Sequence, residues 1–234
     1  MPELIPYDRQ AAVRYAHQWA FSRNPRYFDF ETIGGDCTNF ASQCLYQGSG
    51  VMNFTPDFGW YYIDAGHKAP AWTGVPYFYN FMTRQEASQG PVGVAASPDM
   101  LLPGDFVQLR FAYDTFGHTP IIVEVGDPPT LDNILVAAHS IDADFRPLNS
   151  YEFQEIRFLH ILGAYLPPGE TTGRPPEPEI VPENGLGGAP LEIRPESPSG
   201  VGTSPGLSGL MGGLWDQLQS AQDSEPEPED SGFN

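Results

Sequence analysis

One stretch of the sequence decides the fold: Gly34-Gly35-Asp36-Cys37-Thr38-Asn39-Phe40-Ala41-Ser42-Gln43-Cys44-Leu45. Its apolar residues recur at the spacing of one helix face, so a helix is expected to begin near Cys37. Asp36 is the expected N-cap, and Gly48 and Gly50 are expected to end the helix. Cys37 then lies in the first turn, where the helix dipole favours the thiolate. The pattern predicts that Cys37 is the nucleophile of a cysteine hydrolase.

Composition restricts the classes of partner and location. The chain has 234 residues and a formal net charge of -19, so it lacks the basic surface that binding to a nucleic-acid backbone requires. No apolar run is long enough to cross a bilayer, and residues 1–15 do not form a conventional signal peptide. We expect no nucleic-acid partner, no transmembrane segment, and either a cytoplasmic location or export by a non-classical route. A monomer is assumed.

The chain contains two cysteines, Cys37 and Cys44. On one helix they stand two turns apart, about 10 Å along the axis, which is too far for a disulfide. Cys44 is expected to be a buried structural thiol. Neither cysteine has a second Cys or His at the spacing of metal ligands, so no metal site and no cofactor are predicted.

Hydrophobic periodicity predicts helices first and antiparallel strands afterwards, which is an α+β layout with N-terminal helices packed on an antiparallel sheet. A first helix should follow Asp8, and a polar connection is expected over 86–100. A hairpin is expected between the strands at 121–125 and 135–138. The expected helices cover 9–21, 37 onward and 75–83, and the expected strands cover 106–109, 121–125, 134–139 and 156–166.

From residue 167 onward proline, glycine, serine and acidic residues dominate. Such a segment cannot bury enough apolar surface to offset its ordering entropy. The prediction is therefore one domain over 1–166 and a disordered acidic tail over 167–234. A short apolar segment at 207–218 is either a docking element for an unknown protein or a collapsed patch without a partner, since its glycines weaken a helix.

Residues 51–80 are rich in aromatic side chains, interrupted by glycines and prolines. Most of these rings are expected to belong to the core and its covering loops. Trp60, Tyr61 and Trp72 are also candidates for the walls of a substrate groove.

A cysteine nucleophile needs a base that accepts its proton. His118 is the strongest candidate, because it follows a glycine and opens a strand where its ring can face a cleft. His17 and His67 are expected to be solvated, and His160 is expected to be structural.

The third member of the site and the oxyanion donors are less constrained. If the predicted hairpin forms, His139 can approach His118 and orient its ring, and Asp142 and Asp144 are alternative orienting acids. The Cys37 backbone N–H would be one oxyanion donor at the start of the helix. The second donor stays open among the Asp36 backbone, Gln43 and Tyr15.

Several motifs together carry a family resemblance. They are GGDCTNFASQCL at 34–45, GWYY at 59–62, PGDF at 103–106, GH at 117–118 and HSID at 139–142, after an opening helix at 7–16. Over 7–166 the chain resembles the putative amidase domain of bacterial proteins. That family belongs to the papain-like cysteine peptidase superfamily and is related to the CHAP and NlpC-type cell-wall peptidase domains.

The resemblance implies a papain-like fold and hydrolysis of an amide bond through a thioester. Cys37 would be the nucleophile and His118 the base, with His139 or a nearby acid as the third residue. The implied substrate is a peptide or a peptidoglycan stem peptide. Two other functions remain open: acyl transfer, in which an amine resolves the thioester, and a non-enzymatic module that binds a peptide or protein through the aromatic region and the tail.

Overall fold

The structure is a computed structural model that describes residues 2–173. The predicted docking segment at 207–218 lies outside the described residues, as does all of the predicted tail beyond Gly173. The helices are α1 (Arg9–Trp19), α2 (Cys37–Ser49), α3 (Pro70–Thr73) and α4 (Val75–Met82), with single 3-10 turns at Pro98–Met100 and Leu148–Ser150. The strands are β1 (Glu3–Ile5), β2 (Gly90–Ala96), β3 (Phe106–Arg110), β4 (Ile121–Val125), β5 (Ile134–Ala138), β6 (Ala143–Pro147) and β7 (Glu155–Leu166).

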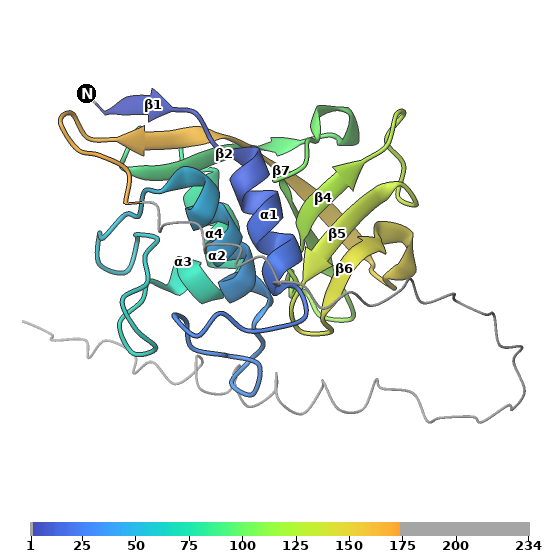
Figure 1. Ribbon diagram of the computed structural model, residues 1–234. Coiled ribbons are helices and arrows are strands. Elements are labelled where there is room, and N and C mark those ends of the chain that lie inside the picture. Colours follow the sequence, from blue (N-terminus) through green and yellow to red (C-terminus); the bar gives the residue numbers. More distant parts are fainter. Residues whose placement is uncertain (1, 174–234) are drawn as a thin grey trace, which may run out of the picture. The chain divides into compact units, whose positions relative to one another are not determined.

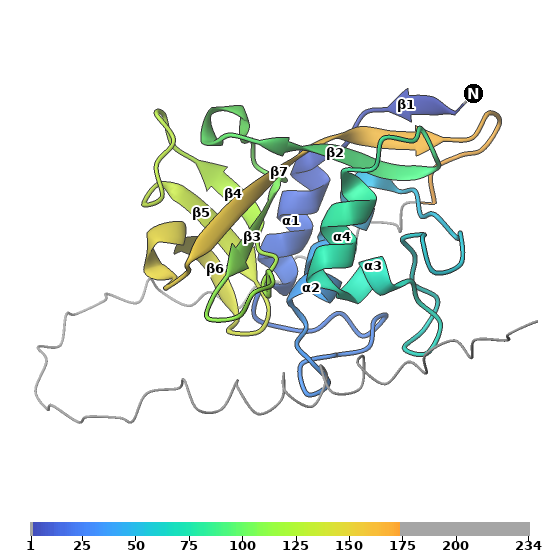
Figure 2. The ribbon, with the colours of Figure 1, turned by 180° about the vertical axis from the view of Figure 1, so that it is seen from behind.

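All strand pairs of the sheet are antiparallel, in the order β1-β7-β3-β4-β5-β6, with β2 also paired to β7. The registers place β1 and β3 along one edge of the 12-residue strand β7 and β2 along its other edge. β7 therefore runs from the β3–β4 end of the sheet to the β1–β2 end (Figure 2). This strand joins the two halves of a curled sheet.

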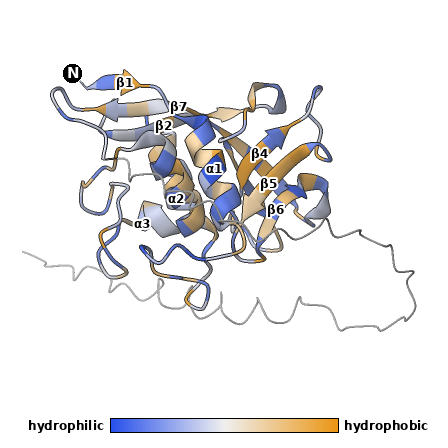
Figure 3. Ribbon diagram, in the orientation of Figure 1, coloured by the Kyte–Doolittle hydropathy of each residue, from blue (hydrophilic) through white to orange (hydrophobic). Residues whose placement is uncertain are grey.

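The helices lie on one side of the sheet (Figure 1): α1 packs on α2, α2 on α3, and α4 on α3 and β2. α1 and α2 contact each other and also contact strands of the β4–β5 hairpin. Strands β4 and β5 are largely hydrophobic along their length (Figure 3), because one of their faces meets the helices and the other a second apolar cluster. Residues 2–173 contain no helix long and apolar enough to cross a membrane.

The predicted hairpin is confirmed, with Ile121 opposite Ala137 and Val125 opposite Ile134. The first helix is also confirmed, and the Asp8 side chain accepts a hydrogen bond from the Ala11 N–H at 3.0 Å. The expected polar connection at 86–100 is wrong, because it contains strand β2. Strands β1 and β6 were not expected from the sequence either.

Gly48 does not end the cysteine helix, as the sequence suggested, but lies inside it. A Cβ at this position would lie 2.2 Å from Cε2 of Tyr7 and 2.8 Å from the backbone oxygen of Asp8. The glycine therefore allows the start of α1 to approach α2. Gly50 is the residue that ends the helix, in the left-handed conformation with φ of 65°.

We expect Gly48→Ala to lower the free energy of unfolding by about 1–3 kcal/mol, because the added methyl group overlaps Tyr7 and the backbone. Gly117→Ala is the matched control, since a Cβ there meets nothing within 4 Å. Urea unfolding followed by circular dichroism measures both. Equal stability of the two variants would contradict the close approach of α1 and α2.

Candidate active site

Asp36 fixes the start of α2, where Cys37 is the first helical residue. Its side chain makes no capping hydrogen bond to the helix, contrary to the expected role of an N-cap. Instead, Oδ1 accepts hydrogen bonds from the Phe30 N–H at 2.9 Å and from Asn39 Nδ2 at 2.8 Å. Oδ2 lies 2.6 Å from Nδ1 of His139. The buried carboxylate therefore ties the preceding loop and the end of β5 to the helix start.

His139 is held by both of its ring nitrogens. Nδ1 contacts Asp36, and Nε2 lies 2.9 Å from the backbone oxygen of Trp19. A carbonyl oxygen only accepts, so Nε2 carries a hydrogen. The ring also stacks on Phe40 with centroids 3.9 Å apart. Neither nitrogen is available to another group of the site.

The expectation that His139 orients His118 does not hold in this structure. The hairpin register, extended by two residues, places His139 opposite Thr119, one position from His118. Successive residues of a strand point to opposite faces. His139 accordingly packs on Phe40 in the helix-side cluster, whereas His118 lies beside Tyr151 in the second cluster.

The alternative acids are engaged elsewhere. Asp142 accepts two hydrogen bonds of 2.9 Å from Arg23 at the surface, and Asp144 lies 2.9 Å from Nδ1 of His17. Neither contact involves His118, so the structure does not support them as its orienting acids.

The Cys37 sulfur lies against the segment that leads into β4. It is buried, 3.7 Å from Oγ1 of Thr38. Burial raises the pKa of the Cys37 thiol above its ordinary value, although hydrogen bonds from the Thr119 backbone N–H and from Thr38 lower it in part. The expectation that the thiol is easier to ionise at the helix start is therefore wrong for this site. The sulfur meets the backbone of the residue directly after His118.

His118 is also buried, and its ring is flanked by two aromatic rings. Centroids lie 5.6 Å away for Tyr151 and 6.3 Å away for Phe111. Burial, together with the smaller effect of the Arg146 charge, lowers the pKa of His118 to about 4. No hydrogen bond of the ring to another residue is found within residues 2–173. The imidazole is therefore neutral near pH 7 and able to accept a proton.

A buried polar chain holds the two sides of the site together. Thr38 donates to Oγ1 of Thr119 at 3.2 Å, and Gln108 donates to the same oxygen at 3.1 Å. Gln108 also donates to the backbone oxygen of Val75 at 2.8 Å. These contacts fix the first turn of α2 relative to β3 and β4. Thr119 adjoins His118 in the sequence, but nothing in the sequence pattern identified this role.

Two of the proposed oxyanion donors are already engaged in hydrogen bonds. The Asp36 backbone N–H is already donated to Oγ of Ser140 at 2.8 Å. Tyr15 donates to Oε1 of Gln43 at 2.7 Å, and both side chains are buried. The Cys37 N–H remains a candidate, because N–H groups of a first helical turn have no acceptor within the helix. Gln43 also stays a candidate, because its Oε1 is the atom that accepts from Tyr15 and its Nε2 is the donor.

Trp60 and Trp72 do not wall an open groove, because neither has exposed surface. Their indole N–H groups donate to Oγ of Ser42 at 3.0 Å and to Oδ1 of Asn39 at 2.8 Å. Both are core residues that support α2. Tyr61 is only partly buried and packs near Phe54 with centroids 5.2 Å apart, so its role at a groove stays a prediction.

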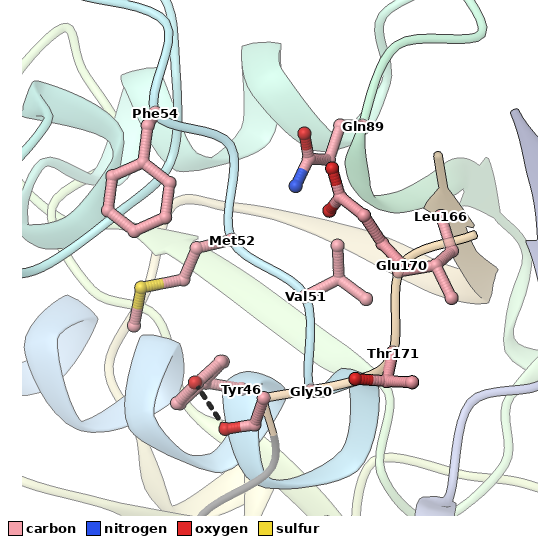
Figure 4. A pocket seen from close by; sticks show the side chains of 10 residues that line it. Tyr46, Gly50, Val51, Met52, Phe54, Gln89, Leu166, Glu170 and Thr171 are labelled. Carbon is pink, nitrogen blue, oxygen red and sulfur yellow. Dashed lines mark hydrogen bonds between the residues drawn. The ribbon is translucent and has the colours of Figure 1, made fainter. Parts of the chain in front are cut away.

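A pocket of about 170 Å³ lies at the opposite end of α2 from Cys37. It is formed by the end of the helix, the segment that follows it and the segment after β7 (Figure 4). Since α2 has 13 residues, the pocket is about 20 Å along the helix axis from the cysteine. It is not part of the candidate active site. It is lined by Tyr46, Gly50, Val51, Met52, Phe54, Gln89, Leu166, Glu170, Thr171 and Gly173.

The remaining histidines follow the sequence expectation for the most part. His160 lies 2.8 Å from the buried Asp105, which confirms a structural role. His67 is exposed. His17 is only partly solvated and stacks on Phe145 with centroids 4.6 Å apart.

The Cys37 thiol at the start of α2 lies against the backbone N–H of Thr119, the residue that follows His118. These residues define the candidate active site. The chain belongs to the family described as "Putative amidase domain", whose model matches residues 6–162. It is similar to "Uncharacterized protein YhbB" of Bacillus subtilis (strain 168), with 33% identity over 145 residues. That alignment covers 60% of this chain and 43% of the relative's length. No solved structure matches.

The geometry at His139 predicts a structural effect. We expect His139→Ala to lower the free energy of unfolding by about 3–5 kcal/mol, because it leaves the buried Asp36 carboxylate without its closest partner. Urea unfolding measures the change, and His67→Ala is the exposed control, with an expected change within about 0.5 kcal/mol. A fully stable His139→Ala variant would show that Asp36 does not depend on this pair.

Proposed function

We propose that the protein is a cysteine-dependent amidase or peptidase with a papain-like arrangement, in which Cys37 is the nucleophile and His118 the base. The observation that carries this proposal is the position of the Cys37 sulfur at the start of α2, against the Thr119 backbone N–H. His118 precedes that N–H directly. The family membership supports amide hydrolysis as the class of reaction.

The proposed reaction starts from a neutral Cys37 thiol and a neutral His118 imidazole. The thiol proton passes to His118 as the sulfur attacks the carbonyl carbon, and the carbonyl electron pair moves to oxygen. The Cys37 N–H donates to that oxyanion at the positive end of the helix. Collapse re-forms the carbonyl and breaks the C–N bond, and His118 returns its proton to the leaving amine. Water then hydrolyses the thioester, with His118 again as the base.

The proposed substrate is a peptide or a peptidoglycan stem peptide. Its identification requires incubation of the protein with purified peptidoglycan and with peptide libraries, and measurement of the products by mass. Acyl transfer uses the same first step, and added amines that appear in the products would distinguish it from hydrolysis.

A peptide-binding module without catalysis is the second candidate, and the burial of Cys37 and His118 is the observation that favours it. Iodoacetamide labelling of the native protein separates the two. A catalytic Cys37 should be alkylated before Cys44, which has no exposed surface and whose thiol pKa burial raises well above its ordinary value. Equally slow labelling of both thiols would favour the binding module.

The nucleophile has a direct test. We expect Cys37→Ala to lower kcat by roughly 10³-fold or more while the protein stays folded, because the covalent step is lost. Cys44→Ala should keep the activity and cost about 1 kcal/mol of stability, because it removes a buried sulfur. Normal turnover by Cys37→Ala would refute the assignment.

The depressed pKa of His118 predicts the pH dependence. Below about pH 4 the imidazole is protonated and cannot accept the thiol proton, so kcat/KM should fall on the acid side of that value. Above it the base is neutral and kcat/KM should reach a plateau that includes pH 5–7. Initial rates in overlapping buffers measure the profile. An acid limb near the ordinary histidine value of about 6.5 would mean that His118 is not the titrating base.

A further inference from the structure

Arg146 in β6 presents a fixed cation near the candidate site. Its Nε donates to Oγ of Ser150 at 2.8 Å, and its Nη2 donates to the backbone oxygen of the same residue at 3.1 Å. The guanidinium lies 3.7 Å from the centre of the Tyr151 ring. Within residues 2–173 no carboxylate forms an ion pair with it and no contact engages Nη1. The cation is therefore positioned without a matching anion.

Tyr151 provides a second observation that points to a ligand at this place. The residue is nine-tenths buried, and its hydroxyl makes no hydrogen bond of good geometry within the described part of the chain. The Arg146 side chain approaches the hydroxyl closely enough to offset part of the pKa rise that burial causes. An unpaired buried hydroxyl costs about 1–3 kcal/mol. Burial raises the pKa of Tyr151, so the group is an O–H donor at neutral pH.

Arg146 and Tyr151 both lie near the proposed reacting groups, His118 and Cys37. The Tyr151 ring lies 5.6 Å from the His118 ring. The charge of Arg146 acts on His118, and the charge of a Cys37 thiolate acts on Tyr151. A group that accepts hydrogen bonds from both Arg146 and Tyr151 would therefore sit beside the base and the nucleophile.

We propose that Arg146 and Tyr151 form an anion subsite that binds a carboxylate of the substrate, next to the amide bond that Cys37 attacks. This inference rests on the proposed function and narrows its substrate class to amides that carry a carboxylate close to the scissile bond. Arginine is suited to this role because its planar fork pairs with both oxygens of a carboxylate. Nη1 and the Tyr151 hydroxyl are the donors that remain for it.

The subsite also makes proton transfer to His118 depend on the bound substrate. With the subsite empty, the positive charge of Arg146 opposes protonation of His118. A bound carboxylate neutralises that charge, so His118 accepts the thiol proton more readily when the substrate is in place. Substrates without the carboxylate lose both the binding contact and this assistance.

The test compares two alkylating reagents on the full-length chain, iodoacetate and iodoacetamide. In both reactions the Cys37 sulfur forms a bond to the reagent carbon, iodide leaves, and the thiol proton is released. The ratio of the two rates at Cys37 is measured by mass spectrometry of the labelled peptide. The same ratio in the urea-denatured chain is the reference for an isolated thiol.

We expect the iodoacetate-to-iodoacetamide ratio at native Cys37 to exceed the denatured reference by on the order of tenfold. The net charge of -19 repels iodoacetate in general, so such a preference must be local. Arg146→Gln should abolish it, Arg146→Lys should retain part of it, and Tyr151→Phe should reduce it. Arg26→Gln changes the net charge equally at an exposed site and should leave the ratio unchanged.

Three results would overturn the inference. A native ratio equal to the denatured reference, with Cys37 still reactive to iodoacetamide, would remove the subsite and leave the proposed function intact. An equal loss in Arg26→Gln and Arg146→Gln would reduce the effect to net charge. Failure of Cys37 to react with either reagent would remove the proposed function and the subsite with it.

Discussion

The carboxylate of Asp36 is the constraint on which the candidate site depends. It has no exposed surface, and a buried charge must be matched by donors to be tolerated. Its donors come from three places in the chain: the loop before α2 at Phe30, the helix itself at Asn39, and the end of β5 at His139. Satisfying one acid therefore brings three segments together at the residue before Cys37.

The close packing around this acid extends to its neighbours. Gly35 adopts a φ of 98°, and a Cβ there would lie 3.1 Å from Oγ of Ser140. That hydroxyl accepts the Asp36 N–H and donates to Glu31 at 2.8 Å. The glycine is needed for this approach, and the serine completes the pairing of the backbone that leads into α2. The helix start is thus held by the turn after β5 as well as by the acid.

Local periodicity predicted those elements whose burial shows in their own sequence. The apolar faces of α1, α2 and α4 and the β-branched run of β4 are of this kind. Strands β2 and β6 escaped prediction because Gly90–Ala96 and Ala143–Pro147 contain glycine, proline or charged residues in place of an alternating pattern. They are strands because β7 and β5 offer them an edge to pair with. Such edges are set by the tertiary fold.

The same difference between local sequence patterns and long-range pairing explains which residues of the candidate site can be predicted. Cys37 and His118 are candidates from the sequence because each is expected where a regular element begins. Cys37 does begin α2, whereas β4 begins at Ile121 and His118 lies in the segment that leads into it. The role of His139 could not, since a shift of one residue along a strand moves a side chain to the other face of the sheet. The sequence suggests that Asp36 is a local cap, whereas its closest partner, His139, lies 103 residues away. Long-range pairing of this kind leaves no periodic signal.

Burial sets the electrostatic character of the site. It raises the pKa of the Cys37 thiol and lowers that of His118, so both groups are uncharged before the reaction. In the proposed reaction, charge would be created as the sulfur attacks, inside a region where each unpaired charge is costly. The donors that lower this cost are fixed in advance: the N–H groups at the start of α2 and at Thr119. Without substrate, the protein favours the neutral Cys37 thiol and the neutral His118 imidazole. In the proposed reaction, the substrate must therefore supply part of the charge that stabilises the ionised state.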